Sequence, residues 1–161
     1  MIEVRLRHDD IDFDHWDGLF LASLETAELR AETVQMGYSL KKLLTELEAT
    51  NKEARAHLAR LEEIAFPTSF AWAAAYWQIS AQPALVAYLW SWLENQVMAA
   101  MKALPLGQTD GQRMMLKLGD RVVSIAARAA LLEDDELGSF APGLALLSSH
   151  HETQYSRLFR S

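Results

Sequence analysis

The spacing of the apolar residues is the feature that most restricts how this chain can fold. Apolar residues recur every three or four positions along the sequence. Between residues 25 and 47 the series is Leu29, Thr33, Met36, Leu40, Leu43 and Leu47. Such steps place side chains on one face of an α-helix, whereas a strand requires alternation of polar and apolar residues. No segment of any length alternates in that way. The sequence therefore predicts an all-α fold.

Proline, glycine and capping residues divide this pattern into about six to eight helices of one bundle. We expect helices at residues 13–23, 25–47, 51–64, 70–80 and 83–103, from residue 109 onward, and after Ser139, with Pro142 in the first turn.

The helix boundaries follow from local chemistry. Asn51 is a possible N-cap, and Thr109 to Gln112 match a capping-box pattern. Pro67 is expected to break the chain, so that Thr68 or Ser69 caps the following helix.

Two of these helices carry further predictions about packing. Gly37 lies inside a helix, where glycine costs roughly 1 kcal/mol relative to alanine, and a close helix–helix approach would explain it. In the helix after residue 109, the predicted buried face is Met115, Leu118, Val122, Ile125 and Ala129. The predicted outward face is Arg113, Lys117, Arg121 and Arg128.

Size and composition limit the class of protein. The 161 residues, half of them hydrophobic, suit a single globular domain with a real core. The net charge of -7 disfavours nucleic-acid binding, and no apolar run is long enough to span a bilayer. The absence of cysteine excludes disulfides and thiol nucleophiles, and we expect a cytoplasmic protein. We divide the chain into a charged lead-in at 1–12, a helical domain at 13–149 and a tail at 150–161.

The residues that could carry chemistry are few. Glu25, Glu28 and Glu32 share a helical face and would suit a metal-binding helical bundle, but the Glu-x-x-His pairs of such sites are missing. His150 and His151 are candidate metal ligands without a second ligand cluster. Phosphate-binding, zinc-protease and nucleophile-elbow motifs are absent, so we expect no catalytic residues, no resident cofactor and no enzyme.

The C-terminal tail is rich in residue types that bind proteins. Ordering its twelve residues costs on the order of 12–24 kcal/mol, while burying three large side chains returns about 5–9 kcal/mol. Those side chains are Tyr155, Leu158 and Phe159. Two readings remain open, a tail that a partner orders and a tail that docks on its own domain.

Aromatic residues crowd one helix. Tyr88, Trp90 and Trp92 point in different directions around it, so one set can fill the core while another faces a partner. We therefore expect a homodimer that uses this helix.

Four separated segments then resemble one family in the right order. They are residues 28–37 (ELRAETVQMG), 87–97 (AYLWSWLENQV), 105–109 (PLGQT) and 136–161 with its ELGSFAP and HETQYSRLFRS motifs. Together they are similar to the UreF family of urease accessory proteins. The resemblance covers roughly residues 13 to 161.

The resemblance implies an all-helical homodimeric scaffold. Such a scaffold would bridge UreD (also called UreH) and the GTPase UreG while nickel, handled by the assembled complex, is loaded into the urease apoprotein. Matched partner-binding positions are Lys102, Tyr155, Arg157, Leu158, Phe159 and Arg160. Matched dimer positions are Val86, Tyr88 and Trp90, and other matched motif positions are Glu28, Arg30, Glu32, Gln35, Asn95 and Gln108.

One departure from the family pattern leaves alternatives to the scaffold function open. Family members begin with an additional segment containing a Ser-Pro-x-x-Pro-x-Gly-like motif, and residues 1–12 do not match it. The alternatives are a truncated or degenerate homologue that dimerises without assembling the complex, and a helical-bundle metal-binding enzyme.

Overall fold

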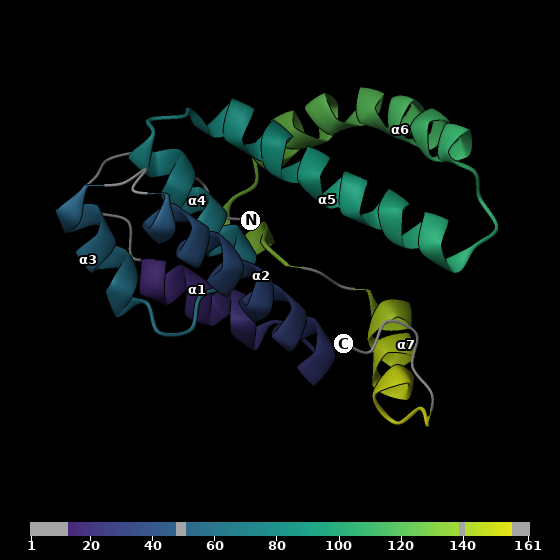
Figure 1. The fold of residues 1–161 in the computed structure, drawn as a ribbon, viewed down its shortest axis with the longest axis horizontal. Helices are drawn as coiled ribbons and strands as arrows, with labels where there is room; N and C mark the ends of the chain where they lie inside the picture. Colours follow the sequence, from purple (N-terminus) through teal and green to yellow (C-terminus); the bar gives the residue numbers. More distant parts are fainter. Residues whose placement is uncertain (1–12, 48–50, 139–140, 156–161) are drawn as a thin grey trace.

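The computed structural model describes residues 13–47, 51–138 and 141–155, and all regular structure within them is helical. The elements are α1 (Phe13–Ala22), α2 (Ala27–Glu46), α3 (Lys52–Arg60), α4 (Phe66–Tyr76), α5 (Ala81–Ala103), α6 (Gln108–Ala129), the 3-10 turn η1 (Asp134–Glu136) and α7 (Pro142–Glu152). The all-α prediction is confirmed. Figure 1 shows α1 to α4 gathered in one group and α5 and α6 as a long antiparallel pair, while α7 lies at one side, in contact with α2.

Helix α4 lies at the centre of the first group and packs against α1, α2 and α5. It can be buried on nearly every side because most of its residues are small. The core around it consists of Leu44, Leu58, Leu61, Ile64, Trp72 and Ala73. Trp72 is fixed further, because its indole N–H donates to His57 Nδ1 at 2.9 Å and its ring stacks on Tyr76.

The approach between α2 and the start of α4 depends on Gly37. A Cβ built at Gly37 would lie 2.7 Å from the Ala65 carbonyl carbon and closer still to the Ile64 carbonyl oxygen. The expected close approach is therefore present, but its partner is the backbone leading into α4 rather than the side of another helix.

The start of α4 differs from the prediction. The helix begins at Phe66, with Pro67 in its first turn, where the missing N–H of proline costs nothing. Its N-cap, Ala65, has no capping side chain, and more distant residues serve instead. Asp17 of α1 accepts from Ala65 N at 2.9 Å, and Thr33 of α2 accepts from Phe66 N at 3.2 Å.

The predicted caps of this helix, Thr68 and Ser69, are wrong, because both side chains are buried inside α4. The end of α3 was also predicted too late. The helix stops at Arg60, and Leu61 to Ile64 cross to α4 as non-helical chain. Its N-cap is confirmed, since Asn51 accepts from Ala54 N at 2.8 Å.

Helices α5 and α6 pack along a line of small residues. Leu93, Val97 and Val122 form their shared core, and Gly111 and Ala126 of α6 are also buried. Because these small residues turn toward α5, Leu118 and Ile125 stand at the margin of the contact with 39% and 47% exposure. The prediction that both are buried is wrong. The helix also begins at Gln108, where the Asp110 carboxylate accepts from Gly107 N at 3.3 Å.

Helix α7 has no buried residue, and it contacts the rest of the chain at the first turn of α2. In the described part of the chain, no helix combines the length and apolar character that crossing a bilayer would require.

Candidate functional site

The first turn of α2 and the last turn of α7 form a polar junction, which we call the α2–α7 junction. The Thr26 and Ser148 hydroxyls are hydrogen-bonded at 2.7 Å. His151 Nδ1 lies 2.6 Å from Glu28 Oε2, and the Glu152 carboxylate accepts from Glu28 N at 3.1 Å. A carboxylate at this position is favourable because the first N–H groups of a helix are unpaired and its N-terminus is partially positive.

The two histidines at this junction have different surroundings. His151 is engaged with Glu28, while His150 is exposed on α7. Nowhere in the described ranges do three His, Asp or Glu side chains come together as metal ligands do. Glu25 precedes the N-cap of α2, so the predicted helical face shared by Glu25, Glu28 and Glu32 is wrong. Glu25 and Glu32 are exposed, and Glu28 contacts one histidine.

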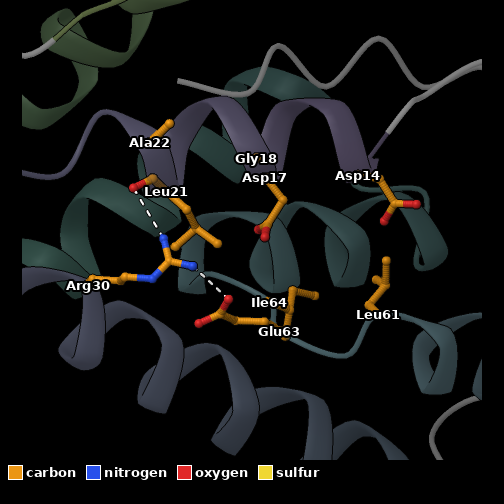
Figure 2. A pocket seen from close by; sticks show the side chains of 9 residues that line it. All are labelled: Asp14, Asp17, Gly18, Leu21, Ala22, Arg30, Leu61, Glu63 and Ile64. Carbon is orange, nitrogen blue, oxygen red and sulfur yellow. Dashed lines mark hydrogen bonds and ion pairs between the residues drawn. The ribbon is translucent and has the colours of Figure 1, made fainter. Parts of the chain in front are cut away.

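Arg30 lies one turn further along α2 and links three elements. Its guanidinium donates to the Leu21 carbonyl oxygen at 3.4 Å and to the Glu63 carboxylate at 2.6 Å. Figure 2 shows this side chain spanning one wall of an open depression, while Asp14 and Asp17 project from α1. The depression has a volume of about 350 Å³, and its lining includes the carboxylates of Asp14, Asp17 and Glu63, of which Glu63 pairs with Arg30.

The remaining family-motif residues occupy two separate places. Glu32 and Gln35 are exposed on α2, next to the α2–α7 junction along the same helix. Asn95, Lys102 and Gln108 are exposed on the distal half of the α5–α6 pair, near the connection between the two helices (Figure 1). The structure therefore does not bring all the predicted site residues together.

The predicted dimer residues lie on two faces of α5, with Val86 and Trp90 toward α6 and Tyr88 toward α4. Val86 packs against the core shared with α6, and Trp90 is 42% exposed and covers Gly119. Tyr88 packs its ring against two phenylalanines of α4, and burial raises the pKa of its phenol above the usual 10.0. Trp92 is 54% exposed. Trp90 and Trp92 therefore present apolar surface to solvent, whereas Val86 and Tyr88 pack inside the chain.

The predicted tail is only partly described. Tyr155 follows α7 and is fully exposed. Arg157, Leu158, Phe159 and Arg160 lie outside the described residues. Up to Glu152 the C-terminal part of the chain does dock on its own domain, through the α2–α7 junction.

Sequence reasoning missed three residues that build these sites. Asp17 caps α4, and Ser148 and Glu152 bind the first turn of α2. The signal for Asp17 is indirect: the N-cap of α4 is Ala65, which has no capping side chain, so the helix needs an acceptor from elsewhere. The contacts of Ser148 and Glu152 join residues more than a hundred positions apart and carry no local signal.

Comparison with known proteins identifies the family to which the chain is similar. The model of the UreF family matches residues 2–119. The urease accessory protein UreF of Azoarcus sp. (strain BH72) is 54% identical over 155 residues, which are 95% of this chain and 66% of that protein. UreF of Dechloromonas aromatica (strain RCB) is 54% identical over 88% of this chain and 63% of its own length.

A third relative, UreF of Nitrosospira multiformis, is 48% identical over 95% of this chain and 68% of that protein. The chain thus spans about two thirds of the length of the relatives it matches. The family match covers well over half of the chain, and the alignment with the Azoarcus protein covers 95% of it. The chain belongs to the UreF family of urease accessory proteins.

Proposed function

We propose that this chain is a non-enzymatic scaffold that bridges UreD (UreH) and the GTPase UreG while nickel is inserted into the urease apoprotein. The observation that carries the proposal is the family match over residues 2–119, together with 54% identity to two urease accessory proteins. The scaffold works in the cytoplasm, and nickel is handled by the assembled complex rather than by a cofactor site of this chain.

The C-terminal tail is the contact for UreD in this proposal. Tyr155 is fully exposed and directly follows α7, so its ring is available to a partner without any rearrangement of the helices. Exposed aromatic and arginine residues gain most from burial at a protein interface. Arg157, Leu158, Phe159 and Arg160 supply that composition immediately beyond it.

Lys102 provides a second contact surface. It is exposed in the last turn of α5, beside the connection to α6. A bridging protein needs two surfaces that partners can occupy together, and the tail and Lys102 lie on different elements.

Helix α5 is the proposed homodimer contact. Trp90 and Trp92 expose 42% and 54% of their surface, and exposed tryptophan is costly unless a partner covers it. Val86 and Tyr88 then support the contact from within the chain, because both are packed in its interior faces.

The test is a stepwise pull-down with purified UreD, followed by UreG with GTP and nickel. A chain truncated after Tyr155 removes residues 156–161 but keeps every contact of the α2–α7 junction. We expect this truncation to abolish UreD capture, and Lys102→Ala to weaken UreG recruitment. Lys42→Ala is the matched control, because Lys42 is an exposed lysine on α2 that pairs with Glu46 at 3.6 Å.

Three outcomes contradict parts of the proposal. UreD binding that survives the truncation refutes the tail assignment. Capture of UreD without UreG refutes the bridging role. A folded chain that binds neither protein supports the degenerate-homologue alternative.

A further inference from the structure

The outward face of α6 is basic in an otherwise acidic chain. Arg113, Lys117, Arg121 and Arg128 are all exposed and lie on one side of the helix, because their spacing follows its turns. We call these four residues the α6 basic stripe. Two carboxylates share this face, Asp110, which pairs with Arg113 at 3.3 Å, and the exposed Asp120. Four cations against two carboxylates leave the stripe net positive in a chain whose net charge is -7.

Exposed aliphatic side chains border the stripe on both edges. Leu118 and Ile125 are 39% and 47% exposed on one edge, and Leu116 and Val123 are 71% and 59% exposed on the other. The members of each pair are seven residues apart, which is about two helical turns, so each pair forms a continuous edge.

These aliphatic side chains are not needed by the core of this chain. The contact between α6 and α5 uses the smaller residues Gly111, Val122 and Ala126, which are fully or almost fully buried. A helix face that only needs to stay soluble carries few exposed aliphatic residues. Arginine combined with exposed aliphatic surface is instead the composition of a protein–protein interface.

We propose that the α6 basic stripe and its two aliphatic edges form a docking surface for an acidic, partly apolar surface of a protein partner. Charge complementarity identifies the sign of the partner, and the aliphatic edges indicate that it brings apolar side chains as well.

A folded protein fits better than an extended polyanion such as nucleic acid or an anionic membrane. The exposed acidic turn at Glu133 to Glu136 directly follows α6, and the rest of the chain is strongly acidic. A long polyanion laid along the stripe would meet that repulsion, whereas a local acidic patch need not extend so far.

This surface is distinct from those of the proposed scaffold. Lys102 belongs to α5 and the tail follows α7, so substitutions on the basic stripe leave both unchanged. Binding at the basic stripe can therefore be tested separately from binding at the tail.

The experiment uses the full chain and a fluorescent helical peptide of about twenty residues, with glutamates on one side and leucines along its edge. We expect salt-sensitive binding in fluorescence anisotropy, weakening as the salt concentration rises from about 50 mM to about 300 mM. The double variant Lys117→Glu/Arg121→Glu should weaken binding about tenfold or more.

The matched control is Lys42→Glu/Lys52→Glu, which changes the net charge equally but alters α2 and α3. It should bind as the unaltered chain does. A second stripe variant, Lys117→Gln/Arg121→Gln, introduces no repulsion and should lose less affinity. Circular dichroism verifies that each variant keeps its helices.

Equal losses in the stripe and control variants would overturn the proposal, since they would show attraction to net charge alone. Absence of peptide binding would overturn it as well. So would binding of phosphatidylserine vesicles or duplex DNA through the stripe in preference to the peptide.

Discussion

Two glycine-to-alanine substitutions should change stability in opposite directions, although both lie inside helices. Gly37 is buried in α2 against the backbone that leads into α4. Gly18 lies in α1, where an added Cβ would meet no atom within 4 Å. Alanine improves helix propensity at both positions by roughly 0.5–1 kcal/mol. The difference between the two variants therefore isolates the effect of the close approach.

At Gly37 the added methyl group cannot be accommodated by a side-chain rotation. The nearest atoms are the Ile64 carbonyl oxygen and the Ala65 carbonyl carbon and oxygen, the last two at 2.7 and 2.9 Å, and all belong to backbone. The clash can be relieved only if α2 and the start of α4 separate. That movement also strains the hydrogen bond that Phe66 N donates to Thr33. Overpacking of this kind costs about 1–3 kcal/mol, and a backbone obstacle places the cost in the upper part of that range.

After subtraction of the propensity gain, we expect Gly37→Ala to destabilise the chain by about 2 kcal/mol. We expect Gly18→Ala to stabilise it by about 0.5–1 kcal/mol. For a chain of this size the melting temperature should fall by about 4–8 °C in the first variant and rise slightly in the second.

Urea unfolding followed by circular dichroism measures both effects, with the slope of the transition as a check that the unfolded state is unchanged. A Gly37→Ala variant as stable as the original chain would refute the close approach. A loss of stability in Gly18→Ala would refute the reasoning on propensity.

Three further predictions concern polar groups. Asp17→Ala leaves the buried Ala65 N–H without its acceptor and should cost about 1–3 kcal/mol in urea unfolding, whereas Asp17→Asn, which retains an acceptor oxygen, should cost less. The raised pKa of Tyr88 keeps its phenol neutral in the folded chain. Stability should thus be intact below pH 10.0 and fall as the pH rises through the raised pKa, and Tyr88→Phe should remove this component of alkaline unfolding. Glu28→Gln weakens the contact with His151 and should accelerate hydrogen exchange in α7 while leaving global stability within about 0.5 kcal/mol, because α7 buries no residue.

The helical elements could be predicted because their signals are local. Three- and four-residue apolar steps located α2 and α5 to within about two residues, which is the usual uncertainty of helix ends. Asn51 was identified as a cap because asparagine accepts from a backbone N–H three residues ahead, within the same segment.

The start of α4 could not be predicted, because its caps come from other helices. A proline followed by Thr68 and Ser69 has the local pattern of a break and a cap. In the folded chain Asp17 and Thr33 supply the acceptors, so the helix can start before Pro67. The rotation of α6 was missed for a similar reason. Periodicity favours the largest side chains as the core face, but close packing on α5 selected Gly111 and Ala126.

The candidate site, too, was predictable only where the signal is local. The motif residues Glu28 and Arg30 were identified from the sequence, but their partners His151 and Glu63 were not assigned to them. Those contacts join α2 to α7 and to the segment before α4. Resemblance can indicate which positions carry function, whereas only the fold shows which of them meet.

The separation of the two predicted partner surfaces has a measurable consequence. Lys102 lies at the distal end of α5, and Tyr155 follows α7, which touches α2 (Figure 1). Substitutions at distant sites without shared partners have additive free energies. If the chain bridges two proteins, Lys102→Ala and Tyr155→Ala should each weaken capture of one partner, and their effects on assembly should add within about 0.5 kcal/mol. A coupling well above that value would place both residues in one continuous surface, and a bridge with two independent contacts would then be the wrong description.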